Sequence, residues 1–234
     1  MAGRTGTGKQ KLIGLLGGSF DPVHLGHINL AQELLNLYSL DEIYLIPNKQ
    51  NPLKPSSPMA TNEQRLKMLS LAIGEIGEPR IKMGPWELER QSLSYTIDTL
   101  VELKAKNILS NESESILILG NEVFQQFKDW KSPREILERT HLCIVNRDPL
   151  LDSVLSEQLR SLGILDGTKI GNRVIHSNGS RWVENVKINA LPYSSTKLRE
   201  KINLALKLGP TAKMPQGIQR SVWLFIKENQ LYGR

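Results

Sequence analysis

Short apolar segments alternate with segments of helical periodicity along this chain, and this alternation restricts its fold more than any other feature. Strands are predicted over 11–16, 42–47, 115–120 and 141–147, with short strands over 173–176 and 186–189 and short strands or extended chain over 80–90. Helices are predicted over 26–38, 62–73, 95–106, 151–162, 196–207 and 216–229, with a further short one from Pro133. Strands that are apolar throughout and separated by helices indicate a parallel sheet covered on both faces. The sequence therefore predicts a doubly wound, Rossmann-like α/β fold, mostly parallel, that binds ligands at the carboxyl ends of its strands.

Residues 11–234 are expected to form one domain, and residues 1–10 a flexible tail. Within the tail, Gly3 to Lys9 matches the opening of a phosphate loop, but Gln10 follows where a hydroxyl residue is needed, and no strand can precede it. No apolar run approaches the roughly 18 residues of a membrane span. The single cysteine, Cys143, fits a reducing compartment. We expect a cytoplasmic protein that does not enter the membrane.

The net charge of +6 does not by itself indicate a nucleic-acid-binding protein. Lysines and arginines are spread along the chain and form no basic cluster. A moderately basic surface also suits an enzyme whose substrates carry several phosphates. We therefore expect phosphate-bearing small molecules, and no nucleic acid, as partners.

The first strand ends in a segment rich in small residues, just before a helix. Gly17 and Gly18 allow positive φ angles and let a bound group approach the backbone without a clash at Cβ, and Ser19 adds a hydroxyl. The helix begins near Leu25, so its free amide groups and its dipole favour an anion at this junction. The segment is a candidate phosphate site.

Two histidines stand three residues apart in the first turn of that helix, on one face. Imidazoles at His24 and His27 can donate hydrogen bonds to phosphate oxygens, more strongly if protonated, and Gly26 lets a nucleotide lie close. They could instead be incidental residues of a helix start. A metal site with His141 and Cys143 is disfavoured, because those two are alternate residues of one predicted strand and no third ligand near His24 is visible.

The segment GGSFDPVHLGH, residues 17–27, resembles the signature G-G-T/S-F-D-P-x-H-x-G-H of the nucleotidyltransferases that carry an H-x-G-H motif. It lacks the G-x-G-x-x-G fingerprint of dinucleotide-dependent oxidoreductases, so hydride transfer of that type is disfavoured.

A second candidate phosphate site lies in YSSTKLREKI, residues 193–202. Ser195 or Thr196 is expected to cap a helix, with Arg199 one turn further on, an arrangement that suits a phosphate. Taken alone, the segment fits an ordinary capped surface helix better than a phosphate site. The segment SSTKLR resembles the I-S-S-T-x-x-R motif of the same superfamily, although Tyr193 replaces the usual aliphatic residue.

The resemblance implies direct in-line attack of an acceptor phosphate on the α-phosphate of ATP, with pyrophosphate leaving and no covalent enzyme intermediate. Mg²⁺ would be held by the triphosphate rather than by protein ligands. The residues implied to hold the triphosphate are His24, His27, Ser195, Thr196 and Arg199. Further ATP-binding residues implied are Gly17, Gly18, Ser19, Phe20, Gly26 and Lys54. Lys54 is either part of a mobile cover over the triphosphate or a solvated loop lysine.

Three other segments resemble the bacterial nicotinate mononucleotide adenylyltransferases, enzymes of NAD synthesis: residues 88–104, 117–137 and 214–234. This family implies transfer of AMP to nicotinate mononucleotide, giving nicotinate adenine dinucleotide. Trp130 offers a flat face for the pyridine ring, or serves as a core anchor. Thr96 lies near a helix start whose amides could receive the carboxylate, or is simply a cap.

Glu122 stands where this family usually has Asp in its ribose-contacting segment, so its role as a substrate contact is a weaker inference. Two alternatives remain open on the sequence. One is a sister enzyme with another acceptor, nicotinamide mononucleotide or phosphopantetheine, and the other is a non-catalytic nucleotide-binding module. The sequence does not determine whether the chain forms a homo-oligomer.

Overall fold

The computed structural model describes residues 10–49, 57–91, 93–146, 152–162, 169–170, 173–175, 181–189, 191–209 and 211–233. The tail predicted over residues 1–10, apart from Gln10, lies outside these residues, and so does Lys54. Among the described helices, none combines the length and the apolar character that crossing a membrane requires.

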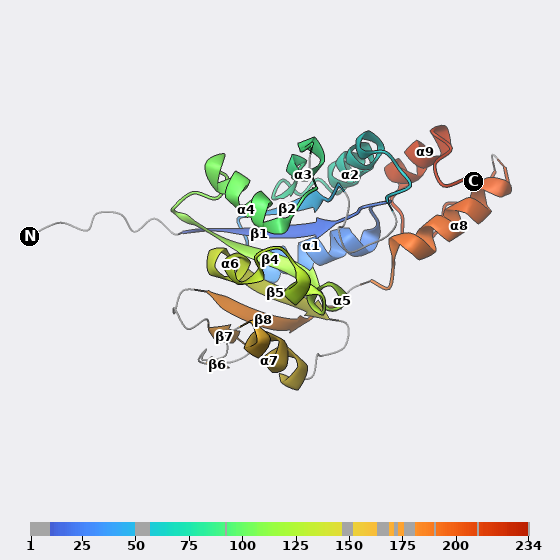
Figure 1. The fold of residues 1–234 in the computed structure, drawn as a ribbon. Coiled ribbons are helices and arrows are strands. Elements are labelled where there is room, and N and C mark those ends of the chain that lie inside the picture. Colours follow the sequence, from blue (N-terminus) through green and yellow to red (C-terminus); the bar gives the residue numbers. More distant parts are fainter. Residues whose placement is uncertain are drawn as a thin grey trace, which may run out of the picture.

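The described strands form one sheet in the order β3-β2-β1-β4-β5-β8-β7-β6 (Figure 1). Their bounds are β1 Lys11–Gly18, β2 Glu42–Pro47, β3 Ile81–Met83, β4 Ser113–Gly120, β5 His141–Asn146, β6 Lys169–Ile170, β7 Arg173–Ile175 and β8 Trp182–Lys187. All pairs from β3 to β8 are parallel, and β7 and β6 are added antiparallel at one edge. The predicted mostly parallel α/β sheet is confirmed.

Helices cover both faces of this sheet. One face carries α1 Leu25–Leu37, α2 Asn62–Ile76, α8 Ser195–Lys207 and α9 Arg220–Glu228. The other carries α3 Trp86–Glu89, α4 Thr96–Ala105, α5 Asn121–Phe124, the 3-10 turn η1 Phe127–Asp129, α6 Pro133–Arg139 and α7 Asp152–Ser161. Side chains alternate between the two cores, so Ile13 and Leu15 of β1 face the second set of helices while Leu16 faces the first.

The order of the strands reverses at β1, which pairs with β2 on one side and β4 on the other. The chain winds outward from β1 to β3, returns to β4 and then winds outward in the other direction. At such a switch point the loops after neighbouring strands diverge and leave a crevice at the carboxyl ends. In Figure 1, β1 points toward the end of the molecule where α8 lies.

Local signals explain why α2 extends beyond its predicted end at residue 73. The helix begins at a reciprocal cap, where the Gln64 N–H donates to Thr61 Oγ1 at 3.2 Å and the Thr61 N–H donates to Gln64 Oε1 at 2.9 Å. It ends at Gly77, which takes the left-handed conformation with φ +67°. The glycine at residue 77, rather than the fading apolar pattern, sets the end.

Three sequence predictions on the edges of the fold are wrong. The last helix, predicted over 216–229, spans Arg220–Glu228. Residues 86–89 form α3 instead of extended chain, because Trp86 turns into the core and the Leu88 N–H donates to the Pro85 carbonyl at 2.9 Å. The last central strand spans Trp182–Lys187 rather than 186–189, and Trp182 stacks on His141 of β5 at 4.5 Å. The stacking of these two rings accompanies the pairing of β5 with β8, which therefore begins near residue 182.

Candidate active site

The junction between β1 and α1 lies at the carboxyl end of β1, as predicted, and the freedom that its two glycines offer at positive φ is not used. Neither Gly17 nor Gly18 adopts a positive φ; both belong to the strand, and Phe20 takes the left-handed conformation instead, with φ 47°. A Cβ on Gly17 would meet nothing within 4 Å, whereas one on Gly18 would lie 3.2 Å from the Phe20 ring. Gly17 is therefore the open position of the pair.

Phe20 adopts its unusual conformation while fully buried, which indicates that burial of the ring offsets the backbone strain. Its ring meets that of His27 edge-to-face, with centroids 4.8 Å apart. The aromatic ring of the turn is thus packed directly against the histidine pair.

His24 and His27 form one stacked unit. Their ring centroids lie 3.7 Å apart with 19° between the planes. His24 is the N-cap residue of α1, and its backbone N–H donates to Nδ1 of His27 at 3.3 Å. His27, the third residue of α1, therefore has the role that Gln or Glu has in a capping box.

Burial, and secondly the neighbouring imidazole of His24, hold the pKa of His27 well below its usual value of 6.5. His27 is therefore neutral at physiological pH, and it donates as a neutral imidazole rather than as the stronger, protonated donor. Because Nδ1 accepts a hydrogen bond, the proton of the neutral ring lies on Nε2. His27 presents a single N–H donor on its far side.

The second motif opens α8, but its N-cap is Ser194 rather than Ser195 or Thr196 as expected. The Ser194 hydroxyl accepts from the Lys197 N–H at 3.4 Å. The Ser195 hydroxyl is used elsewhere: it donates to the Pro22 carbonyl at 3.0 Å. This contact binds the second motif directly to the first, and it explains the one-residue shift of the cap.

Arg199 makes the next link between the two motifs. Its guanidinium donates to the Asp21 carbonyl at 2.7 Å and to the Thr196 hydroxyl at 3.2 Å. Residues separated by about 180 positions in sequence are thus in contact, and the starts of α1 and α8 open onto one junction. The structure brings His24, His27, Ser195, Thr196 and Arg199 together.

Two glycines allow this close approach. A Cβ on Gly26 would lie 3.0 Å from the His24 ring and 3.3 Å from the Leu191 carbonyl, so protein atoms occupy the space beside it. Gly217, with φ +96°, accepts from the Leu25 N–H at 2.9 Å, and a Cβ there would lie 2.4 Å from the Tyr193 ring. Tyr193, which departs from the resembled motif, therefore packs where Gly217 has no side chain.

Arg65 is a component of the junction that the sequence reasoning missed. Its side chain is fully buried in α2 and donates to the Ser19 carbonyl at 2.8 Å, the Asn48 carbonyl at 2.7 Å and Asn62 Oδ1 at 2.8 Å. Burial lowers the pKa of Arg65, but a guanidinium remains charged. One signal could have revealed it: Arg65 precedes Met68 and Leu69 by three and four residues, on the apolar stripe of the helix.

The predicted acceptor residues Thr96 and Trp130 lie on neighbouring segments. Thr96 is the first residue of α4, and Trp130 follows η1, half-buried, with its ring 5.2 Å from Phe127. The next residue, Lys131, forms an ion pair with Asp98 in the first turn of α4 at 2.9 Å. Its ammonium also lies 4.9 Å from the Tyr95 ring. Lys131 thus fastens the Trp130 segment to the start of α4.

Glu122 lies in α5, directly after β4, and its side chain is exposed. A pocket of about 470 Å³ lies between the segment after β2, the start of α2 and the segment before α4. Its lining residues are Lys49, Ser57, Pro58, Ala60, Thr61, Asn62, Gln91 and Leu93. Lys49 donates from Nζ to the carbonyls of Arg90 and Gln91 at 2.5 and 3.1 Å, so it joins two walls of this pocket.

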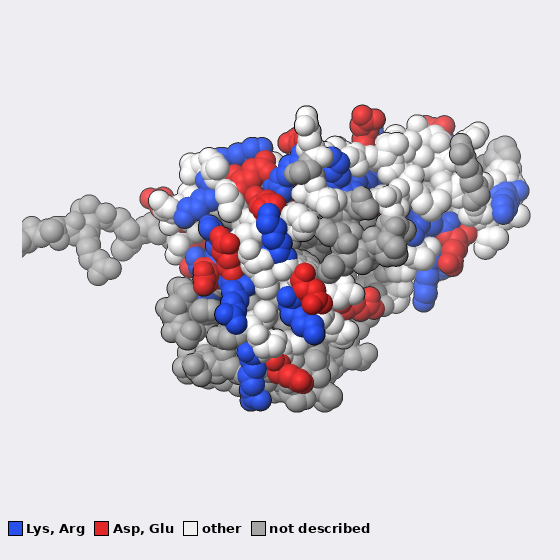
Figure 2. Space-filling model, viewed as in Figure 1, with Lys and Arg blue, Asp and Glu red and all other residues white. Residues whose placement is uncertain are grey.

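His141 and Cys143 lie on β5, away from the histidine pair. Both ring nitrogens of His141 have protein partners, Glu114 at 3.0 Å and the Trp182 N–H at 3.2 Å. Across the residues that the structure describes, no group of three potential metal ligands occurs. Basic and acidic side chains are interspersed on the face in Figure 2.

Known proteins resemble this chain in sequence and in fold. A model of the cytidylyltransferase-like family matches residues 15–201. A relative from Rhodopirellula baltica, called "Probable nicotinate-nucleotide adenylyltransferase", is 35% identical, and the match covers 81% of each chain. One of the same name from Hahella chejuensis is 34% identical over 94% of this chain and 95% of the relative. The solved structure of Plasmodium falciparum nicotinic acid mononucleotide adenylyltransferase complexed with NaAD shares the fold, with a TM-score of 0.66 at 18% identity, and the match covers 95% of this chain and 97% of that one.

Proposed function

This chain belongs to the nicotinate-nucleotide adenylyltransferase family, and on that premise we propose how it joins AMP from ATP to nicotinate mononucleotide, a step of NAD biosynthesis. The observation that carries the proposal is the convergence of the α1 and α8 starts, joined by the contacts of Ser195 and Arg199 with the backbone of residues 21–22. Each start directs the positive end of its helix dipole toward this junction, and together they form a two-sided site for a polyphosphate.

The triphosphate of ATP is proposed to lie between these helix starts. His27 donates from Nε2–H to a phosphate oxygen, and His24 supports it by stacking. The guanidinium of Arg199 and the hydroxyl of Thr196 contact the triphosphate from the α8 side. Gly17, whose Cα faces open space, lets the nucleotide approach the end of β1.

The reaction requires positioning and charge stabilisation more than a covalent group on the enzyme. A phosphate oxygen of nicotinate mononucleotide attacks the α-phosphorus of ATP, a new P–O bond forms, and the bond from that phosphorus to the bridging oxygen of the β-phosphate breaks. Pyrophosphate leaves with that electron pair. Neutral His27 and cationic Arg199 stabilise the charge that accumulates on the transferring group.

Mg²⁺ is proposed to bind to the triphosphate rather than to a carboxylate of the junction. The nearby carboxylate, Asp21, is buried and already accepts hydrogen bonds from the Met59 and Ala60 backbone and from the Tyr232 hydroxyl. The ion would supply charge neutralisation on the polyphosphate. A cytoplasmic location is also proposed, in keeping with the buried, free thiol of Cys143.

For the acceptor, we propose that the pyridine ring lies on Trp130 and that its carboxylate meets the backbone amides at the start of α4, near Thr96. The Lys131–Asp98 ion pair supports this, since it holds the two segments together. Lys131 also places a positive charge beside the proposed carboxylate position. Glu122 is proposed as a weaker substrate contact, exposed in α5 directly after β4.

A pyrophosphate-release assay with ATP, Mg²⁺ and a panel of acceptors tests the proposal. Nicotinate mononucleotide should give the highest kcat/KM, above nicotinamide mononucleotide and phosphopantetheine. A preference for either of the other two would indicate a sister adenylyltransferase. Binding of ATP without pyrophosphate release from any acceptor would indicate a non-catalytic nucleotide-binding module.

A further inference from the structure

Asp21 is a buried carboxylate that links segments far apart in the sequence, three residues before the first histidine. Only 2% of its surface is exposed. One carboxylate oxygen accepts from the Met59 N–H at 2.8 Å, and the other accepts from the Ala60 N–H at 3.2 Å. The second oxygen also accepts from the Tyr232 hydroxyl at 2.6 Å. Asp21 thus connects the β1–α1 turn to the segment before α2 and to the segment after α9.

Tyr232 is itself fixed at two points. Its side chain is nearly buried, with 6% of the residue exposed, and its hydroxyl lies 3.9 Å from the Met68 sulfur in α2. Its backbone carbonyl accepts from the Asn203 amide of α8 at 3.0 Å. Burial, and secondly the Asp21 carboxylate, raise the pKa of Tyr232, so its hydroxyl stays protonated and remains a donor.

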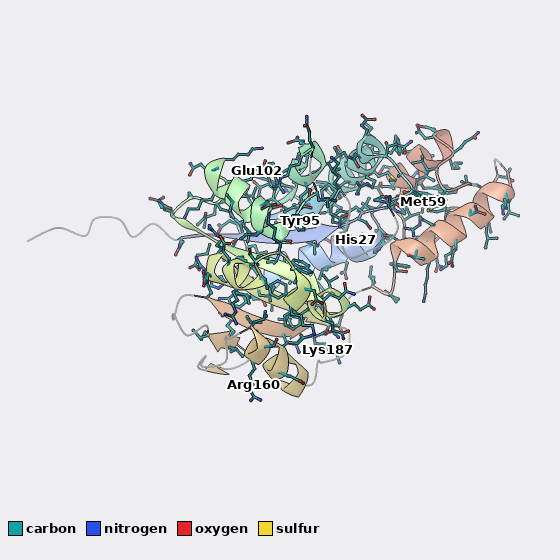
Figure 3. The ribbon with its side chains drawn as sticks, viewed as in Figure 1. His27, Met59, Tyr95, Glu102, Arg160 and Lys187 are labelled. Carbon is teal, nitrogen blue, oxygen red and sulfur yellow. The ribbon has the colours of Figure 1, made fainter. Side chains whose placement is uncertain are left out.

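Asp21 is held through both its carboxylate and its peptide carbonyl. The carboxylate accepts from the Tyr232 hydroxyl, and the carbonyl accepts at 2.7 Å from Arg199, whose guanidinium also lies 3.9 Å from Oδ2 of the carboxylate. The next carbonyl, of Pro22, accepts from Ser195. A shift of Asp21 would therefore move the points at which α8 contacts the turn, and the histidine pair that follows. Figure 3 shows His27 and Met59 toward the same end of the molecule.

We propose that the Tyr232 hydroxyl is a positioning group for adenylyl transfer: acting through Asp21, it fixes the turn that presents His24 and His27 to the triphosphate. This inference rests on the proposed function in one respect, that ATP is the ligand of the junction. Tyr232 itself does not contact the reacting atoms. Its effect should fall on ATP, because the acceptor side is built from α4 and the Trp130 segment instead.

Tyr38 provides a matched control for a purely structural role. It is also a tyrosine whose hydroxyl donates to a carboxylate, Glu184 at 2.9 Å, and burial raises its pKa as well. It follows the last turn of α1, so it lies at the end of the helix opposite the histidines. Tyr38→Phe and Tyr232→Phe each remove one such hydroxyl and keep the ring.

The test compares these two variants with the wild-type chain by steady-state kinetics, by calorimetric binding of a non-hydrolysable ATP analogue, and by thermal denaturation. For Tyr232→Phe we expect about tenfold lower kcat/KM for ATP and about tenfold weaker analogue binding, with the KM for nicotinate mononucleotide within about twofold of wild type. Tyr38→Phe should lower the Tm comparably and leave both ATP parameters near wild type.

Unchanged ATP kinetics and analogue affinity in Tyr232→Phe would overturn the proposal, as would equal losses for ATP and acceptor. If Tyr232→Phe does not fold, Asn203→Ala replaces it, because it removes the hydrogen bond to the Tyr232 carbonyl. Asn203→Ala should weaken analogue binding about threefold. An unchanged affinity would overturn the proposal. If the wild-type chain releases no pyrophosphate, the proposed function fails, while analogue binding still tests the role of Tyr232.

Discussion

The ring of His27 stacks on the ring of His24 at 3.7 Å while its Nδ1 accepts the His24 backbone N–H at 3.3 Å. The stack fixes the plane of the ring and the hydrogen bond fixes its tautomer. Together they leave Nε2–H as the one N–H donor of the ring. The pair therefore works as one preorganised donor rather than as two independent imidazoles.

His27→Ala should lower kcat by about a thousandfold, because it removes a preorganised donor to the transferring phosphate group. Pyrophosphate release measures this loss, and circular dichroism with thermal denaturation shows whether the fold persists. Turnover at the wild-type rate in a folded His27→Ala variant would refute the assigned role.

The free energy of unfolding should depend on pH through His27. The pKa of His27 is lowered in the folded chain, whereas an unfolded chain titrates near 6.5. Below that pH the unfolded chain binds more protons, so the free energy of unfolding decreases as pH falls, by at most about 1.4 kcal/mol per pH unit for one histidine. His141, whose pKa burial also lowers, adds a change of the same sign.

Urea denaturation between about pH 7.5 and 5.5 measures this slope. His27→Gln should flatten it in part, and the double variant with His141→Gln further still. Equal slopes in wild type and His27→Gln would show that His27 does not titrate on unfolding.

Trp130→Ala should raise the KM for nicotinate mononucleotide about tenfold and change the KM for ATP little, because the ring is proposed to stack on the pyridine alone. Kinetics with each substrate varied in turn give the two values. A similar rise in both would point to lost packing on Phe127 instead.

Lys131→Ala should raise the KM for nicotinate mononucleotide about fivefold by releasing the Trp130 segment from α4, with a stability change of less than about 1 kcal/mol, since the ion pair is exposed. Arg139→Ala is the matched control, because it breaks the exposed pair with Glu135 on α6 at 2.7 Å. The prediction fails if the two variants have the same KM.

Arg65→Met should lower the free energy of unfolding by about 3 kcal/mol, because the carbonyls of Ser19 and Asn48 lose a charged donor in the interior. It should also weaken ATP binding through the loosened Ser19 segment. Arg80→Met, which breaks an exposed pair with Glu78, should unfold at nearly the wild-type urea concentration. A small effect at Arg65 would mean that water replaces the guanidinium.

The parts of the fold that sequence predicted are those specified locally. The bounds of β2 and α4 are predicted to within one residue, because the spacing of apolar residues and the turn residues on either side indicate the same ends. The N-cap of α8 was misplaced by one residue, since Ser194, Ser195 and Thr196 are locally equivalent. A contact with Pro22, more than 170 residues away, distinguishes them.

The parts of the candidate site that sequence did not predict depend on distant partners. The apolar stripe of α2 indicates that Arg65 is buried, but its partners, the carbonyls of Ser19 and Asn48, lie 46 and 17 positions away in the sequence. The positive φ at Phe20 follows from where the ring is buried, which no pattern around residue 20 encodes. Tyr232 and Asp21 meet only because α9 folds back onto α2.

The close fit of Tyr193 against Gly217 makes these two positions mutually dependent during evolution. A methyl group at 217 would collide with the ring, and the left-handed backbone there already disfavours other residues. Relatives with tyrosine at position 193 should keep glycine at position 217. A smaller residue at 193 would remove the clash with a side chain at 217, although the positive φ there would still favour glycine. Aligned relatives should therefore show linked substitution at this pair, on the peptide that carries the Leu25 hydrogen bond.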